Sequence, residues 1–236
     1  MGAKKRDGEP KAFDKEATDR LWEAVARGGS RDDKRVAQAL ARGANPNADD
    51  WEGRETPLLM AILMGRVGAA KILLAAGADP EKSNDYDQRP LELAGCAAAG
   101  KARQLVNLLA EGGARVDAAN SKGWSALMHA CDVGSAEGAE ALLDLGADIE
   151  FEDSKGWTPL VTAIYGARDA AGRACLEIMV ARGARVTERA VERAAAWGSV
   201  EVASWLGAVL LARAESSALE ESSARPAHGG PRAARL

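Results

Sequence analysis

Apolar residues recur along this chain in short blocks separated by turns rich in glycine and polar residues. The segment 56–80, TPLLMAILMGRVGAAKILLAAGADP, shows the pattern clearly: an apolar block, a glycine, a second apolar block and a Gly-Ala-Asp turn. Within the blocks Leu, Ile and Ala recur three and four residues apart, which places them on one face of a helix. The segment therefore predicts two short helices joined by a glycine turn.

The residues that open these segments predict where the first helix of each pair begins. Thr56, Ser125 and Thr158 each precede an apolar block, and proline follows both threonines. A Thr or Ser oxygen accepts a backbone N–H of the first turn, and proline at the first helical position loses no hydrogen bond there. Gly65 and Gly134 follow where a short helix must end in left-handed backbone.

The whole pattern repeats. Gly-Ala followed by a polar residue begins at positions 43, 77, 113, 146 and 183, at intervals of 34, 36, 33 and 37 residues, and Lys-Gly-Trp occurs at 122–124 and 155–157. Self-similarity at this period predicts a stacked array of helix pairs instead of two globular halves. Six repeats fit, of which the first and the last lack the full motif.

The Thr-Pro-Leu words at 56–58 and 158–160 and the Gly-Ala-Asp turns resemble the ankyrin repeat. The resemblance covers roughly residues 17–212. It implies an all-α solenoid of helix-turn-helix pairs joined by β-hairpin loops, which works as a non-enzymatic protein–protein interaction module. The family's His after Thr-Pro-Leu is replaced here by Leu59, Glu92, Met128 and Val161, which puts in question the bonds that His gives to neighbouring loops.

This register predicts three parts of the chain. Residues 1–14 form a flexible basic segment, residues 15–212 form the repeat domain with degenerate caps at both ends, and residues 213–236 form a frayed or disordered tail. The odd repeats carry extra residues between their two helices, as in YGARDAAGRA of repeat five. Surface connections accept insertions cheaply, so drift or an inherited two-repeat duplication explains these residues, and a row of functional loops is the alternative.

Aromatic residues concentrate in the loops between repeats. If the resemblance holds, the tips of these loops line a concave surface, and Trp51, Tyr86, Trp124 and Trp157 all fall in them. Large rigid aromatics are favoured binding anchors. Trp51 and Tyr86 lie nearest the tips and favour binding, whereas Trp124 and Trp157 fit binding and packing on the next loop equally well.

The candidate partner-binding residues are these aromatics, the charges beside them and the exposed ends of the first helices. They are Trp51, Glu52, Met64, Asp85, Tyr86, Lys122, Trp124, Lys155, Trp157 and Tyr165. The charges are acidic in repeats two and three and basic in repeats four and five, which predicts a protein partner of complementary polarity. Trp22 and Trp205 are expected to pack in the core or the caps.

Composition narrows the function classes. The net charge of −4 and the absence of a basic stripe argue against nucleic-acid binding. No segment approaches the roughly 20 apolar residues that span a bilayer, so we expect no membrane insertion. Three cysteines without a Cys-x-x-Cys spacing indicate a reducing compartment, hence the cytoplasm. The terminal Ala234-Arg235-Leu236 resembles the peroxisomal Ser-Lys-Leu address, which is the alternative location.

Catalysis requires a cluster of reactive side chains, and the sequence shows none. Histidine occurs only at positions 129 and 228, and we find no glycine-rich phosphate loop, nucleophile elbow or metal-spaced Cys/His set. His129 is expected to be a satisfied or partly exposed helix residue, not a ligand. We therefore expect no catalytic residue, metal or cofactor; the alternatives to an adaptor are a structural subunit of a larger assembly and a regulatory subunit of an enzyme.

Overall fold

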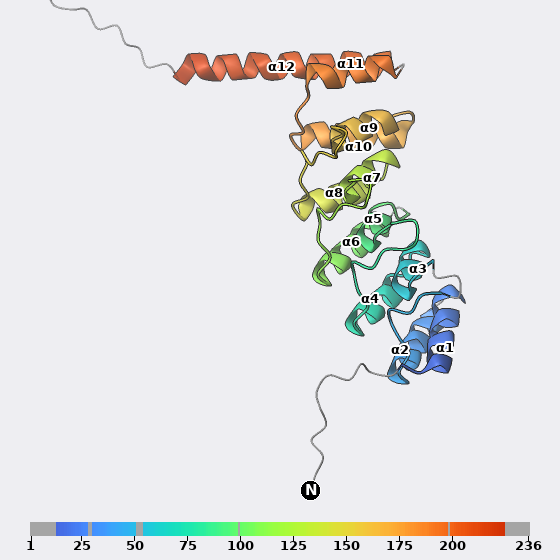
Figure 1. Ribbon diagram of the computed structural model, residues 1–236. Helices are drawn as coiled ribbons and strands as arrows, with labels where there is room; N and C mark the ends of the chain where they lie inside the picture. Colours follow the sequence, from blue (N-terminus) through green and yellow to red (C-terminus); the bar gives the residue numbers. More distant parts are fainter. Residues whose placement is uncertain (1–12, 28–29, 51–53, 99, 198, 225–236) are drawn as a thin grey trace, which may run out of the picture. The chain divides into compact units, whose positions relative to one another are not determined.

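The computed structural model describes residues 13–27, 30–50, 54–98, 100–197 and 199–224 (Figure 1). These residues form twelve helices and no strand. The chain divides into two compact units, residues 1–184 and 185–236. Most of the predicted flexible segment 1–14, the loop residues Trp51 and Glu52, and the terminal Ala234-Arg235-Leu236 lie outside the described residues.

The first unit consists of five helix pairs that follow one another in sequence order. They are α1 (Lys15–Arg27) with α2 (Ser30–Ala41), α3 (Pro57–Leu63) with α4 (Val67–Ala75), α5 (Pro90–Gly95) with α6 (Ala102–Glu111), α7 (Ala126–Asp132) with α8 (Ala136–Asp144), and α9 (Pro159–Gly166) with α10 (Ala170–Ala181). The odd-numbered first helices pack on one another in order, and so do the even-numbered second helices. The predicted all-α repeat fold is therefore confirmed.

The helices begin and end where the sequence predicts. The side chains of Thr56, Ser125 and Thr158 each accept the backbone N–H three residues later, at 3.2–3.4 Å. The five glycines of the Gly-Ala turns adopt φ values of 85–98°, in the left-handed region that other residues enter only with strain. Each second helix in the first unit is thus closed by a residue type that its backbone requires.

The core consists of leucines between small residues. Leu73 in α4 and Leu142 in α8 are completely buried, as the repeat register requires. The helices approach closely because alanine and glycine lie between them: a Cβ atom added to Gly138 would overlap the carbonyl oxygen of Gly95. Removing a leucine from such a dense core leaves a cavity that the neighbouring backbones cannot close.

The second unit contains α11 (Glu188–Ala196) and α12 (Val200–Ala224), which pack on each other. The frayed or disordered tail from residue 213 stays a prediction. In the described part of the chain α12 continues to Ala224, and residues 212–221 are mostly Ala, Leu, Glu and Ser. The Ser216 and Ser217 hydroxyls donate to carbonyls four residues earlier, at 3.0 Å. Leu206 is the last buried residue up to residue 219, and residues 207–219 are half-buried or exposed although the helix continues through them.

Trp205 on α12 is exposed, although the sequence suggested that it packs in the cap. Val202, Ala203 and Leu206 are the buried side chains of that turn, and Trp205, three residues after Val202, lies at the edge of this buried face. Among the described helices, none combines the length and the apolar character needed to cross a membrane.

Candidate binding face

Three of the inter-repeat loops are each closed by a polar side chain at their start. We call Asn84, Asn120 and Asp153 the loop clamps of the loops 84–89, 120–125 and 153–158. Each clamp donates its backbone N–H to the carbonyl four residues later, at 3.0–3.1 Å. Its side-chain oxygen accepts two backbone N–H groups, as Asn120 Oδ1 does from Lys122 and Trp124 at 3.0 and 3.1 Å.

The expected β-hairpins are therefore turns without strands in the described loops. Each is held by its clamp and by a second backbone bond, from the residue three positions on to the clamp carbonyl, at 2.9–3.0 Å. The missing family histidine is not needed for this closure. Leu59, Met128 and Val161, which occupy its place, are simply buried apolar residues.

The clamps determine which side chains reach the loop tips. Asp85, Lys122 and Lys155 are exposed, and the ring of Tyr86, two residues after its clamp, is 62% exposed. Asp87 adopts φ of 60°, where the other loops carry glycine, and this left-handed position was not recognised from sequence. Trp51 and Glu52 stay predictions, because both lie outside the described residues.

Trp124 and Trp157 lie four residues after their clamps and belong to one continuous row of rings. The centroid of Trp124 is 5.2 Å from that of His129 and 6.3 Å from that of Trp157, and Trp157 is 5.9 Å from Tyr165. The guanidinium carbon of Arg168 lies 4.3 Å from the Tyr165 centroid. We call these five side chains the aromatic row.

The aromatic row unites residues from two loops, two first helices and one inter-helix link. Trp124 and Trp157 are half-buried and touch each other, so the packing role that the sequence allowed is present. Tyr165 at the end of α9 is 37% exposed. Met64 and Tyr86 are exposed in earlier repeats, and no ring contact among the described residues joins Tyr86 to the row.

Two members of the aromatic row were missed from the sequence. Arg168 lies in the extra residues between the helices of repeat five, and those residues were the signal that could have pointed to it. His129 was expected only to be a satisfied helix residue. It is indeed partly buried and bonded, but it also forms the edge-on ring contact at one end of the row.

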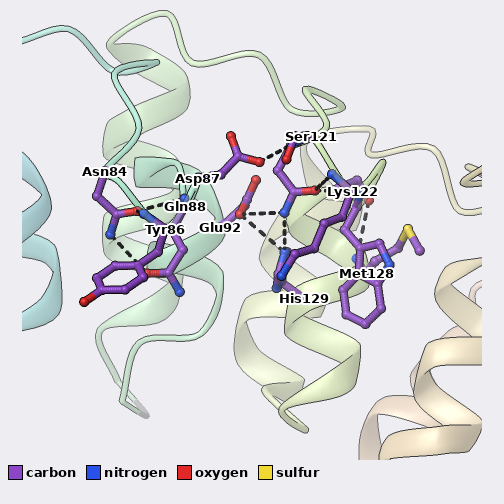
Figure 2. A network of polar contacts seen from close by, with 12 residues as sticks. Asn84, Tyr86, Asp87, Gln88, Glu92, Ser121, Lys122, Met128 and His129 are labelled. Atoms are coloured by element: carbon purple, nitrogen blue, oxygen red, sulfur yellow. Dashed lines mark hydrogen bonds and ion pairs between the residues drawn. The ribbon is translucent and has the colours of Figure 1, made fainter. Parts of the chain in front are cut away.

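A polar network lies directly beside this end of the row (Figure 2). Glu92, in α5, is only 2% exposed, and it points toward His129 of the next repeat in Figure 2. Its Oε2 atom lies 3.3 Å from His129 Nε2 and 3.5 Å from Asn120 Nδ2, and the two nitrogens are 3.0 Å apart. One loop clamp, one buried carboxyl and one ring of the row therefore meet at a single point.

The protonation of this network is set by burial. Burial raises the pKa of Glu92 to about 7, although the Arg89 backbone N–H and the Asn120 amide favour the charged form. Burial lowers the pKa of His129, and the positive charge of Lys122 lowers it further. Both shifts favour the neutral form of the group concerned.

Successive repeats are linked along the loops by side chains that accept a backbone N–H of the next repeat. Asp87 Oδ2 accepts the Ser121 N–H at 2.5 Å (Figure 2), and hydrogen bonds from the Ser121 side chain and backbone lower the pKa of Asp87. The other links are Asn47 to Asp79, Glu81 to Arg115 and Asp117 to Asp148, at 2.7–2.9 Å. We call these four bonds the junction links.

The face as a whole offers rings and charges to a ligand. Arg168 belongs to the aromatic row, exposed Lys122 and Lys155 each come two residues before one of its tryptophans, and Asp85 and Asp87 lie in the preceding loop. The predicted change from acidic to basic side chains therefore falls between one loop and the next. In the parts of the chain that the structure describes, no three His, Cys, Asp or Glu side chains are grouped to hold a metal ion.

Comparison with known proteins gives matches to repeats of one kind. Residues 93–190 match the model of three-copy ankyrin repeats, and residues 54–85 match the model of the single ankyrin repeat. A curated relative is the ankyrin repeat and KH domain-containing protein mask-1 of Caenorhabditis elegans, 37% identical over 91 residues. That match covers 39% of this chain and 3% of the relative.

Proposed function

Because the chain belongs to the ankyrin repeat family, we propose that it is a non-enzymatic adaptor that binds a protein partner through the loop face of repeats three to five. Repeats of this family are protein–protein interaction modules. The observation that carries the proposal is the aromatic row, in which Trp157 contacts both Trp124 and Tyr165 and Tyr165 is partly exposed. Rigid aromatics at the centre of an interface supply a large share of its binding energy.

The charges around the row indicate the chemistry of the partner. Lys122, Lys155 and Arg168 present positive charge beside the rings, so a segment with an apolar anchor flanked by acidic side chains is complementary. Tyr86, beside Asp85 and Asp87, offers a second anchor with acidic neighbours. A partner segment with its acidic residues toward repeats four and five would satisfy both loops.

Two exposed tyrosines and one matched leucine test this assignment. A partner recovered with the intact chain is titrated against Tyr165→Ala, Tyr86→Ala and Leu145→Ala. Leu145 caps the second helix α8 and is as exposed as Tyr165, at 37%, so it controls for the loss of an exposed apolar group. We expect Tyr165→Ala to weaken binding by about 2 kcal/mol, with a smaller loss for Tyr86→Ala and none for Leu145→Ala.

Equal affinity for all three variants and the parent would reject the loop face. A loss confined to Leu145→Ala would assign binding to the second helices instead. Each variant is first checked by thermal unfolding, because only a variant with unchanged stability reports on contact with the partner.

The second candidate function is that of a stable subunit in a larger assembly. It is favoured by α12, on which Val200, Leu211 and Leu219 are exposed large apolar side chains. Sedimentation velocity at micromolar concentration separates the two functions. An adaptor sediments as a single chain, and a subunit sediments with its companions or as an oligomer that Leu211→Glu disrupts.

A further inference from the structure

The orientation of the Asn120 amide is fixed by its own loop. Its oxygen accepts the backbone N–H groups of Lys122 and Trp124, and a backbone N–H can only donate. The amide nitrogen must therefore point the other way, toward His129 Nε2 at 3.0 Å and Glu92 Oε2 at 3.5 Å. Since this nitrogen is a donor, its 3.0 Å contact with His129 Nε2 is a hydrogen bond in the tautomer in which Nε2 carries no proton and accepts.

The remaining contact of the network then needs a proton. Glu92 Oε2 and His129 Nε2 are 3.3 Å apart, and two unprotonated acceptors at that distance repel each other. They are also too close together for the amide of Asn120 to give each a separate well-aligned hydrogen. The contact is favourable when Glu92 is a neutral carboxylic acid whose O–H is directed at Nε2, so that this O–H and the Asn120 amide share the single lone pair of the nitrogen in a three-centre bond.

The second oxygen of Glu92 leads to the same protonation state. Oε1 is buried and has no partner within hydrogen-bonding geometry among the described residues. A buried carboxylate with one bare oxygen is costly, and a neutral acid is much less so. The geometry and the raised pKa of Glu92 therefore agree on a proton that leaves near neutral pH.

The titration of Glu92 also depends on the charged groups of the helices and loops that lie next to it. Arg89 favours its charged form, Asp87 opposes it, and Cys96 lies on the same helix. From α7 and its loop come His129, Asp132 and Lys122. The segment Pro57–Leu63 of α3 has no titratable side chain. On α6 and α8, the Glu137 carboxylate accepts the backbone N–H of Arg103, so this contact joins the two helices to each other. Burial also raises the pKa of Asp132, so the experiment must distinguish the titration of Asp132 from that of Glu92.

We propose that Glu92, His129 and Asn120 form a proton-controlled latch on the aromatic row. With its proton, Glu92 holds His129 against Trp124 and holds the clamp Asn120 in its loop. Without the proton, the carboxylate repels His129 Nε2, and the loop 120–125 and the Trp124 ring lose this support. Partner binding, as far as it rests on the proposed function, is then stronger on the acidic side of neutral pH than on the alkaline side.

The direction of the stability change follows from the same shift. Glu92 has a folded pKa of about 7, above its ordinary 4.5, so its contribution to stability is complete below pH 4.5 and is lost as pH rises through 7. His129 has a lowered pKa, so its contribution is lost only on the acidic side of its ordinary value. Between pH 6 and 8, the shifted pKa of Glu92 taken by itself should raise the unfolding equilibrium constant about tenfold. His129, whose ordinary pKa of 6.5 lies in this window, acts in the opposite direction near pH 6, so the comparison with Glu92→Gln isolates the Glu92 contribution.

The first experiment follows the latch in the intact chain without any partner. The ring protons of His129, in a His228→Gln background, and the indole N–H of Trp124 are recorded by NMR from pH 5.5 to 8.5. We expect both to change with a midpoint near pH 7. Glu92→Gln, a neutral isostere with a permanent donor, should abolish this transition while Asp132 still titrates.

A transition that persists unchanged in Glu92→Gln, or none in the parent, would overturn the latch. Urea unfolding at pH 6 and 8 is an independent measurement. From pH 6 to pH 8 the folding equilibrium constant of the parent should fall by a factor about ten times larger than that of Glu92→Gln. Should Glu92→Gln fail to fold, Glu92→Met replaces it, because Met128 already occupies the equivalent buried position in the next repeat.

The last experiment separates the latch from the proposed function. The dissociation constant of the recovered partner is measured at pH 6 and 8 for the parent, Glu92→Gln and Tyr165→Ala. Weaker parent binding at pH 8, with constant affinity in Glu92→Gln, supports control of binding by the latch. Equal parent affinity at both pH values overturns that control, whereas an unaffected Tyr165→Ala variant rejects the aromatic row and leaves the NMR transition to decide the latch.

Discussion

The loops 84–89 and 120–125 are built on the same frame and yet present their aromatic residues differently. Both are closed by an asparagine whose side chain accepts two backbone N–H groups. Tyr86 follows its clamp by two residues and is exposed, and Trp124 follows its clamp by four and is half-buried against other rings. Position relative to the clamp, more than residue type, therefore decides whether a loop aromatic faces solvent or its neighbours.

The comparison requires that the two repeats differ in their loops and share their core. Leu73→Ala and Leu142→Ala should each cost about 2–5 kcal/mol, because both side chains are completely buried between helices. Equilibrium urea unfolding gives the two values. A loss within experimental error at either site would mean that the repeats do not share one core. The two loops could then not be compared as parts of equivalent repeats.

The sharpest test of the comparison exchanges each aromatic for alanine. Trp124→Ala should lower the free energy of unfolding by about 2 kcal/mol, because its ring contacts His129 and Trp157. Tyr86→Ala should change stability by no more than about 0.5 kcal/mol, since its ring is largely in solvent. Calorimetric unfolding measures both; equal losses would show that distance from the clamp does not set the role.

A third test concerns the left-handed position in each loop. Gly123→Ala should cost about 1–2 kcal/mol, because φ is 80° and the new Cβ would lie 3.3 Å from the Cβ of Asp153. The equivalent Asp87→Ala starts from a residue that already tolerates φ of 60°, so it loses mainly the bond from Ser121. Chemical denaturation should rank Gly123→Ala as the more harmful; the reverse ranking would contradict the shared loop frame.

The smallest expected effect comes from making the first loop resemble the second. Asp87→Gly relieves about 1 kcal/mol of backbone strain and removes the acceptor of the Ser121 N–H, a loss of similar size. Stability should therefore stay within about 0.5 kcal/mol of the parent. Hydrogen exchange at the Ser121 amide should nevertheless accelerate, and unchanged protection there would show that the junction link is not formed in solution.

Much of the fold could be predicted because it follows from local patterns. Thr56, Ser125 and Thr158 mark helix starts by a bond within one turn, and the glycine turns mark helix ends by a backbone angle. The end of the last helix could not be placed in the same way. Residues 213–219 are not buried, as their polar composition indicates, but they still form helical hydrogen bonds, which composition does not show.

The candidate face was predicted less completely, because it depends on contacts between repeats. The sequence placed Trp124 and Trp157 in the loops, but it left open whether they bind a partner or pack on the neighbouring loop. Glu92 was noted as a departure from the family motif, but its approach to His129 requires the turn of a loop that brings residues 92, 120 and 129 together. Arg168 lay in an insertion whose length was noticed and whose target was not.

The junction links give the first unit a mechanical character. Each link crosses from one repeat to the next, so a force that separates two neighbouring repeats must first break the bond at that junction. The four links cover three junctions, because Glu81–Arg115 and Asp87–Ser121 join the same two loops; under tension the three junctions act in series, and a junction held by one link opens before the junction held by two. Under force the unit should therefore unfold in steps of about one repeat, and the repeats should refold when the force is removed.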